Sequence, residues 1–288
     1  MDIKNITKVV VHSGIMHADD VFTVAYIQLV KKALGQEPVQ VIREFKIGLG
    51  QTLKNGYLVA DIGGGRYDHH CREEHKERRP NGAAYASFGL VVRDFHDGFL
   101  TEDEYELFDK KFVEPLDWYD NNGGTNHLAS VIYSFNKPWD DNTPGTDFRF
   151  FTAVKLAMTI LDQYIASIRA LARAKSLALS AKVDGETIYL DRYAPVNEFV
   201  SGSPDIKFIG APSIRGGYQV VAVKNQKGEN KKLFPESIRG LSFGQFEYND
   251  DGLNFCHSSG FMATFRDKEA AKEFMNKWLL DEKGEVEE

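Results

Sequence analysis

Short runs of β-branched residues that alternate with helical segments most strongly constrain how this chain folds. The first run, residues 7–11, ends at His12, and from Asp19 onward apolar residues recur at helical spacing. Residues 39–42 and 57–62 are two further strand-like runs, and three glycines follow the second of them. Strands that alternate with helices predict an α/β fold whose N-terminal domain has a largely parallel sheet flanked by helices.

Helical periodicity dominates the middle of the chain. Residues 84–96 and 101–119 are predicted to be helices, and the second opens with a capping box that begins at Thr101. Residues 136–146 contain two prolines and several Asp and Asn residues, which predicts a loop. From Phe151 the apolar positions keep a helical period to about residue 180, so we expect one long helix there.

The last third of the sequence has a different pattern. From Gly185 onward short strand-like runs replace the helical period, for example residues 187–190 and 218–223, and residues 268–280 predict a final helix. We therefore expect an N-terminal α/β domain joined by a long helix to a smaller α+β C-terminal domain. The expected divisions are residues 1–150 for the first domain, 151–182 for the linker helix and 183–288 for the second domain.

Composition restricts the environment and the partners. The formal net charge is −7, from 35 Lys and Arg against 42 Asp and Glu, which excludes a basic protein that coats nucleic acid by bulk charge. No run of about 18 apolar residues exists and the first residues lack a signal-peptide pattern, which predicts neither a membrane span nor secretion. Cys71 and Cys256 are too few for a disulfide framework or a thiolate zinc site, so we expect a cytoplasmic protein.

Histidine and aspartate gather at four places in the chain. These are His12, His17, Asp19 and Asp20 after the first strand, Asp61 after the third, the run Asp68, His69 and His70, and the segment from Asp117 to Asp120. Because open parallel sheets bind ligands at the carboxyl ends of their strands, His12 and Asp61 should lie close together. Imidazole and carboxylate suit several divalent metals, and a two-metal centre needs several such ligands. Converging carboxylates would otherwise repel one another, so this pattern predicts a site for two divalent cations.

Each place also has a plainer interpretation. His17 and Asp19 could simply cap the first helix, and Asp61 before three glycines could be an ordinary turn residue. The two adjacent histidines could belong to a solvated surface. The charged residues 72–79 are expected to be a solvated, mobile stretch, with a phosphate-guiding patch as the alternative. The coincidence of histidine and aspartate at strand ends favours the metal site.

The motifs, taken in order, resemble a known family. The run Asp68-His69-His70 is the signature of the DHH phosphoesterase superfamily, and the whole set resembles more closely its Myg (melanocyte-proliferating-gene) branch of metal-dependent hydrolases and RNA exonucleases. The matching segments are residues 11–20, 61–64, 66–70, 117–121, 239–241 and 257–261. Two positions depart from the family's usual pattern, with Asp20 in place of Glu and Ser13 in place of Asn.

The resemblance implies a role for each matching residue. One ion would be held by His12, His17 and Asp61, the other by Asp19, Asp61 and Asp120, and both would be approached by His69. His70 would contact the phosphate or assist the leaving group, so Asp68, His69 and His70 form the expected catalytic run. The second domain would supply substrate ligands, expected to be His257, Ser258, Ser259, Arg239 and Arg215. Without the resemblance, His257 would be interpreted as a core histidine at a strand end.

These roles imply a function and its cofactors. We expect a metal-dependent phosphoesterase with a DHH-type catalytic domain that uses two divalent ions, Mn²⁺ or alternatively Mg²⁺, to hydrolyse phosphodiester bonds. The resemblance implies a 3′–5′ RNA exonuclease or oligonucleotide hydrolase, with RNA or a short oligonucleotide as substrate. Two alternatives stay open: a pyrophosphatase or small-nucleotide phosphohydrolase, and a metal- or nucleotide-binding regulatory protein without turnover. No membrane partner is expected, and a homodimer is left open.

Overall fold

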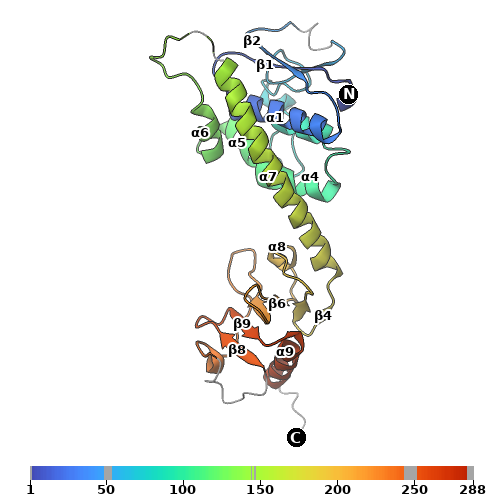
Figure 1. The fold of residues 1–288 in the computed structure, drawn as a ribbon, viewed down its shortest axis with the longest axis vertical. Coiled ribbons are helices and arrows are strands. Elements are labelled where there is room, and N and C mark those ends of the chain that lie inside the picture. Colours follow the sequence, from blue (N-terminus) through green and yellow to red (C-terminus); the bar gives the residue numbers. More distant parts are fainter. Residues whose placement is uncertain (1, 49–53, 144, 146, 243–251, 284–288) are drawn as a thin grey trace. The chain divides into compact units, whose positions relative to one another are not determined.

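The computed structural model describes residues 2–48, 54–143, 145, 147–242 and 252–283 (Figure 1). The chain divides into two compact units, Met1–Arg169 and Ala170–Glu288, which we call the first and the second unit. Helix α7 (Asp147–Ser180) runs from the first unit into the second. Neither α7 nor any other described helix combines the length and the apolar character that a membrane crossing requires. That the chain forms separate domains with limits at residues 150 and 182 stays a prediction.

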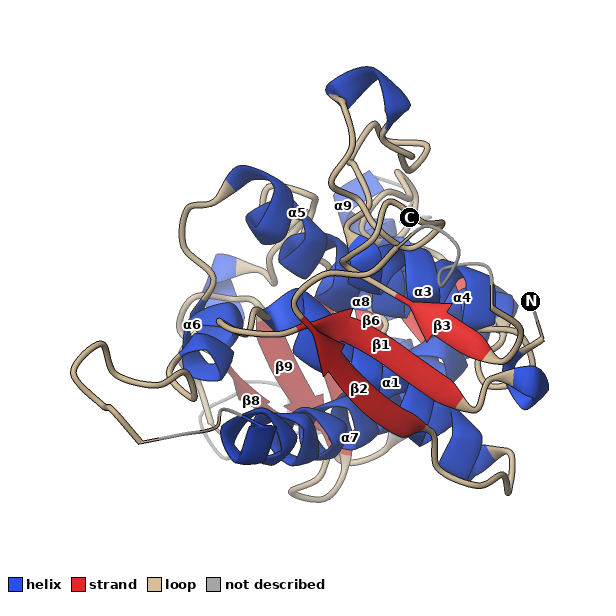
Figure 2. Cartoon of the chain, turned by 90° about the horizontal axis from the view of Figure 1, so that it is seen from above, coloured by secondary structure: helices blue, strands red, loops and turns tan. Residues whose placement is uncertain are grey.

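The first unit contains a three-stranded parallel sheet. Its order is β2 (Gln40–Glu44), β1 (Lys8–His12) and β3 (Tyr57–Val59), as Figure 2 shows. Val10 on the central strand pairs with Ile42 on one side and with Val59 on the other. The middle of β1 is buried on both faces, which is why its sequence is a continuous apolar run. This sheet, together with the helices around it, confirms the predicted α/β class.

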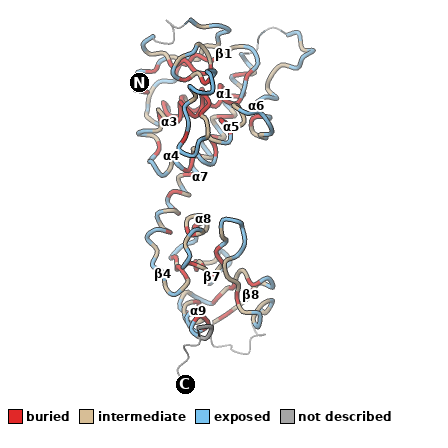
Figure 3. Tube along the Cα trace, turned by 180° about the vertical axis from the view of Figure 1, so that it is seen from behind, coloured by how far each residue is buried: buried red, intermediate tan, exposed pale blue. Residues whose placement is uncertain are grey.

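Several helices belong to the first unit. They are α1 (Ala18–Ala33), α3 (Ser87–Phe95), α4 (Glu102–Phe108), α5 (Glu114–Asn122) and α6 (His127–Tyr133), with short 3-10 turns at Ile3–Asn5 and Glu73–His75. The rings of Phe22 and Tyr26 in α1 pack against Phe88 in α3, and Figure 3 shows buried residues concentrated around α1. The capping box before α4 is confirmed, because the hydroxyl of Thr101 accepts the N–H of Glu104.

The single helix predicted over residues 101–119 is interrupted. A π-helical turn, Asp109–Val113, lies between α4 and α5. The reason is Pro115, which has no N–H to donate to the carbonyl of Lys111. The hydroxyl of Tyr164 donates to that carbonyl instead, at 3.2 Å. A side chain from α7 therefore supplies the hydrogen bond that Pro115 cannot donate to the carbonyl of Lys111.

The second unit is built on a six-stranded sheet within the described residues. Its order is β4 (Val183–Asp184), β5 (Thr187–Tyr189), β6 (Phe208–Pro212), β7 (Tyr218–Ala222), β9 (Met262–Phe265) and β8 (Leu253–Cys256). Only β5 and β6 pair in parallel. Helix α9 (Lys268–Lys283) packs on the sheet through Trp278, whose ring centroid lies 5.5 Å from those of Phe208 and Phe234. The short helix α8 (Asn197–Val200) and a 3-10 turn at Glu236–Ile238 belong to the same unit.

Candidate metal centre

The turn between β1 and α1 carries the first group of predicted ligands. His12 is the last residue of β1, and His17 is the N-cap residue of α1. The N–H of His17 donates to Oδ1 of Asp20 at 3.2 Å, so Asp20 caps the helix. The other oxygen of the same carboxylate, Oδ2, lies 3.0 Å from Nε2 of His12. Helix capping therefore explains the contact of Oδ1 of Asp20, but it does not explain why Oδ2 faces His12.

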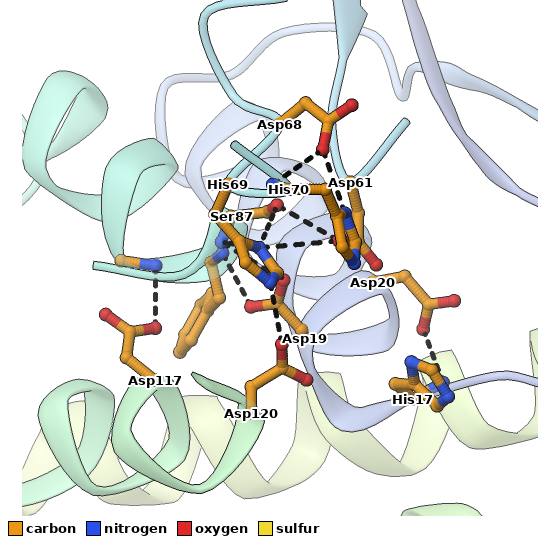
Figure 4. Close-up of polar contacts among 12 residues, drawn as sticks. His17, Asp19, Asp20, Asp61, Asp68, His69, His70, Ser87, Asp117 and Asp120 are labelled. Carbon is orange, nitrogen blue, oxygen red and sulfur yellow. Dashed lines mark hydrogen bonds and ion pairs between the residues drawn. The ribbon is translucent and has the colours of Figure 1, made fainter. Parts of the chain in front are cut away.

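Asp61 has a left-handed backbone conformation just beyond β3. Its φ is 61°, a region that Asp and Asn enter more readily than other non-glycine residues, and its N–H donates to the carbonyl of Tyr67 at 2.9 Å. Oδ2 of Asp61 lies 3.2 Å from Nε2 of His12. Oδ1 lies 3.4 Å from Nδ1 of His70 and 3.5 Å from Nδ1 of the preceding histidine (Figure 4). This buried carboxylate thus faces two groups of candidate ligands, which an ordinary surface turn residue would not do.

Asp68 holds His70 in position and favours its charged form. It accepts the N–H of Gly64 at 2.6 Å and that of His70 at 3.1 Å, and its Oδ1 lies 2.9 Å from Nδ1 of His70. Burial opposes the ionisation of Asp68, but these contacts outweigh it and lower the pKa of Asp68 to about 2. The same hydrogen bond raises the pKa of His70, whose side chain is 62% exposed. Asp68 therefore favours the charged form of this exposed imidazole beside Asp61.

His69 lies in the interior among several carboxylates. Its Nε2 lies 3.0 Å from Oδ2 of Asp120, and its Nδ1 lies 3.6 Å from Oδ2 of Asp19. Its ring stacks on that of His70, with centroids 4.3 Å apart. Because the His69 side chain is buried, the alternative of a solvated surface is wrong for this residue.

Overlapping sets of side chains in the described part of the chain could each hold a cation. The sets, in which the ligand atoms lie within 4.8 Å of one another, are His12, His17 and Asp61; Asp61, His69 and His70; and Asp19, His69 and Asp120. The first set contains the residues expected for one ion. The third set contains Asp19 and Asp120, which were expected for the other ion. Its third member is His69, whereas the expected one was Asp61. Which ligands hold which ion stays a prediction.

Unsatisfied polar atoms indicate that a cation suits this cluster. Nε2 of His12 and Oδ2 of Asp20 are both buried and lie 3.0 Å apart, yet neither makes a hydrogen bond of good geometry within the described residues. Burial favours the neutral ring, but the carboxylates of Asp20 and Asp61 raise the pKa of His12 to about 10. Buried polar atoms without partners cost free energy, and imidazole with carboxylate is a donor set for divalent transition metals. The side chains present therefore fit a divalent cation.

Helix α3 fixes Asp19 through its first amides. The N–H groups of Ser87 and Phe88 donate to the two oxygens of Asp19 at 3.1 and 2.7 Å, at the positive end of the helix dipole. The hydroxyl of Ser87 lies 3.3 Å from Oδ1 of Asp61 and 3.0 Å from Nδ1 of His69. The sequence pattern does not point to Ser87, because a helix predicted to begin at residue 84 places this serine inside it. A hydroxyl residue near a predicted helix start is the only signal that could have found it.

Ser87→Ala should lower the affinity for Mn²⁺ about 10- to 100-fold, which is the usual cost of losing a hydrogen bond that orients a metal ligand. The variant loses the hydroxyl beside Asp61 and His69 but keeps the N–H that donates to Asp19. Calorimetric titration with Mn²⁺ measures the change. Ser130→Ala is the matched control, since that hydroxyl donates only to a carbonyl of its own helix end. Equal affinities for the two variants would contradict the orienting role.

The expectation of a solvated stretch at residues 72–79 is wrong for Arg79. Its side chain is 2% exposed, and its guanidinium donates to both oxygens of Asp109 and to Oδ2 of Asp117, each at 2.7 Å. Asp117 also accepts the N–H of Gly89 at 3.1 Å. A Cβ on Gly89 would overlap the Asp117 carboxylate, so only glycine allows α3 and α5 to approach this closely. Arg79 and Asp117 therefore connect the two helices that carry candidate site residues.

A pocket of about 460 Å³ opens beside the candidate ligands. Its lining includes His17, His69, His70 and Asp120. The volume lies within the range of small-molecule sites, which is about 300–1,000 Å³. The candidate metal centre therefore has room for an organic ligand next to it.

Four of the substrate ligands predicted in the second unit lie together. His257, Ser258 and Ser259 form the turn between β8 and β9, where Nδ1 of His257 lies 2.8 Å from Oγ of Ser259. Arg239 packs directly on Gly260 of the same turn, since a Cβ on Gly260 would overlap the guanidinium. His257 is half-buried and follows the strand end, so it is not a core histidine. Their binding of substrate stays a prediction.

Arg215 is the predicted substrate ligand that the structure does not bring to this turn. It lies in the turn between β6 and β7, and β7 begins opposite Phe265, the last residue of β9. His257 lies beside Met262, the first residue of β9. The N–H of His257 donates to the carbonyl of Met262 at 2.9 Å. Because β7 and β9 are antiparallel, the turns that precede them lie at opposite ends of the sheet.

Comparison with known proteins gives matches along nearly the whole chain. The family described as "Uncharacterised protein family (UPF0160)" matches residues 8–279. The MYG1 protein of Chlamydia trachomatis serovar D is 25% identical over 284 residues, which cover 92% of this chain and 94% of that protein. These matches agree with the Myg branch to which the ordered motifs are similar, and they say nothing about the wider DHH superfamily.

Proposed function

Because the chain belongs to the UPF0160 (Myg) family, we propose that it is a metal-dependent phosphoesterase related to the DHH superfamily. Its substrate is RNA or a short oligonucleotide, cut one nucleotide at a time from the 3′ end. Its cofactors are two divalent ions, with Mn²⁺ as the expected metal. The expected location is the cytoplasm.

The position of Asp61 is the observation that supports two ions rather than one. Its Oδ2 faces His12 of one candidate ligand set, and its Oδ1 faces the histidines of another. A carboxylate shared in this way can serve two cations held a few ångströms apart. A single structural ion would need no carboxylate between two sets of ligands.

The side chains around this carboxylate suit phosphoryl chemistry. Divalent cations held there would supply Lewis-acid activation of water and of the phosphoryl group. Asp68 keeps the ring of His70 in place at the pocket and favours its charged form, so that His70 can contact a phosphate oxygen or protonate the leaving oxygen. Arg239 of the second unit stays a proposed phosphate ligand, because a guanidinium fits phosphate through parallel donors.

A substrate panel tests the proposal. Metal-stripped protein should hydrolyse short RNA and a simple phosphodiester only after Mn²⁺ or Mg²⁺ is added, and EDTA should remove the activity reversibly. The reason is that the ligand carboxylates repel one another and leave water unactivated without the cations. Hydrolysis of pyrophosphate alone would favour the smaller-substrate alternative. Tight metal uptake without turnover of any substrate would favour a regulatory binding protein, and turnover unaffected by EDTA would overturn the metal mechanism.

The direction of cleavage is tested with end-labelled RNA. With a 3′ label, the first product should be a labelled mononucleotide, because removal begins at that end. With a 5′ label, the labelled strand should shorten in steps of one nucleotide. Immediate release of a mononucleotide from the 5′ label would reverse the proposed polarity.

A further inference from the structure

The pocket beside the candidate metal centre has lining residues for which the proposed hydrolysis gives no role. Among them are Lys76, Tyr119, Asn121 and Tyr133. Proteins hold a nucleotide unit by combining a fixed positive charge with aromatic rings. The charge binds the phosphate, and a ring stacks on the base. The pocket therefore combines a candidate metal centre with the elements of a nucleotide site.

Lys76 is held in place at this pocket. Its Nζ donates to Oδ1 of Asn121 at 2.8 Å, and its side chain is only 17% exposed. Asn121 is itself fixed, because its Nδ2 donates to the carbonyls of Tyr85 and Asp117 at 3.2 and 3.0 Å. Since Asn121 follows Asp120 in α5, the ammonium is anchored beside a candidate metal ligand.

The ammonium of Lys76 retains capacity for an anion. Glu73 lies 3.4 Å from Nζ, but its side chain is 67% exposed and also pairs with Arg78. Water therefore screens that ion pair. Lysine has three N–H donors, of which Asn121 and Glu73 occupy two as far as the structure describes the chain. The third can be donated to a phosphate oxygen.

Two tyrosines give the pocket aromatic surface. Tyr119 belongs to α5 and Tyr133 to α6. Tyr133 is 51% exposed as a residue and lines the pocket, so it offers aromatic surface to a ligand. Every nucleobase has a π face, which makes stacking on tyrosine a contact that tolerates any sequence.

We propose that this pocket binds one nucleoside monophosphate unit of the substrate, with Lys76 on its phosphate and Tyr133 against its base. The inference rests on the proposed function, because it seats the terminal nucleotide of an RNA next to the metal centre. It also explains why the pocket contains aromatic rings, for which pyrophosphate offers no partner.

The phosphate contact is tested by calorimetric binding of AMP and of adenosine to the full chain in Mn²⁺. Wild type should bind AMP more tightly than adenosine, and Lys76→Gln should weaken AMP binding roughly 10- to 100-fold, the usual effect of losing a charge-assisted hydrogen bond. Adenosine binding should not change. Lys76→Arg should retain most of the preference. Lys54→Gln is the matched control, because Lys54 lies over Tyr57 before β3, at the other end of the strand from the site.

The base contact is tested with the same ligand and with inorganic phosphate. Tyr133→Ala should weaken AMP binding roughly tenfold and leave phosphate binding unchanged, whereas Tyr133→Phe should bind AMP like wild type. Equal binding of AMP and adenosine by wild type, or an unchanged AMP affinity in Lys76→Gln, would overturn the nucleotide site. AMP is a product without a phosphodiester bond, so these measurements need no turnover. Nucleotide binding without hydrolysis of any substrate would contradict the proposed function alone.

Discussion

Asp61→Asn should lower kcat/KM for phosphodiester hydrolysis about 10³-fold or more. Lewis-acid stabilisation of the transition state is worth several kcal/mol, and about 1.4 kcal/mol corresponds to each factor of ten. Asp61 is the carboxylate whose two oxygens face two candidate ligand sets, so its loss weakens both.

Asparagine rather than alanine is the informative replacement at this position. The φ of Asp61 is 61°, a conformation that asparagine tolerates and alanine disfavours. Asp61→Ala would therefore add backbone strain to the loss of the ligand. Asp61→Asn keeps the shape and the backbone and removes the negative charge, so a loss of activity can be assigned to the metal ligand.

Metal-dependent stability separates this interpretation from a folding defect. A ligand at 100 times its Kd stabilises the native state by about 2.7 kcal/mol, so Mn²⁺ should raise the Tm of the wild type. The same Mn²⁺ concentration should leave the Tm of Asp61→Asn close to its metal-free value. A variant that gains as much stability from Mn²⁺ as the wild type, or that hydrolyses phosphodiesters at the wild-type rate, would refute the role of Asp61 as a shared ligand.

Local sequence patterns were sufficient to predict the sheet of the first unit and the neighbourhood of its strand ends. A continuous apolar run such as residues 9–11 indicates a strand buried on both faces, and strands of this kind are typical of parallel sheets. The carboxyl ends of β1 and β3 then necessarily meet at one edge, which brings His12 to within 3.2 Å of Asp61. These predictions needed only the period of the sequence and the geometry of parallel strands.

Contacts that depend on helix packing could not be predicted in the same way. Ser87 lies beside Asp61 because α3 begins at that residue, and helix starts are fixed by tertiary contacts as much as by sequence. Arg79 occurs in a charged run that has the composition of a solvated surface, yet Asp109 and Asp117 bury it. Arg215 was grouped with His257 from a resemblance, whereas the hairpin geometry of the second unit separates them. Each case depends on residues distant in sequence.

Arg79→Leu should destabilise the first unit by about 3–5 kcal/mol, the usual cost of breaking a buried ion pair from one side. The substitution leaves Asp117 fully buried without its guanidinium partner, and it removes two hydrogen bonds to Asp109. Both carboxylates are attached to the helical segment that continues to Asp120, and Asp117 also binds α3 through Gly89. The candidate metal centre should therefore loosen together with these helices.

The destabilisation caused by Arg79→Leu should grow as the pH rises. Burial raises the pKa of Asp117, and the Arg79 guanidinium opposes that increase. Without Arg79 the folded-state pKa lies still further above its unfolded value, which is about 3.9. The wild-type Asp117 loses its proton near its own pKa of about 8, whereas the folded variant keeps the proton to higher pH, so raising the pH above about 8 favours unfolding more in the variant than in the wild type. Exposed Arg78, which pairs with Glu73, provides the control Arg78→Leu, for which we expect a pH-independent change below about 1 kcal/mol.

Hydrogen exchange of peptides from α3 and α5 is the suitable measurement for Arg79→Leu, because it reports on these helices without assuming that the two units unfold together. After correction for the intrinsic exchange rates, protection of both helices should fall in the variant at pH 7 and fall further at pH 9. Peptides from β7 and β9 in the second unit should keep their protection. Because Asp117 lies one helical turn before Asp120, loss of this protection should be accompanied by weaker Mn²⁺ binding. Protection equal to that of Arg78→Leu at both pH values would mean that the buried ion pair does not stabilise the helices around the metal centre.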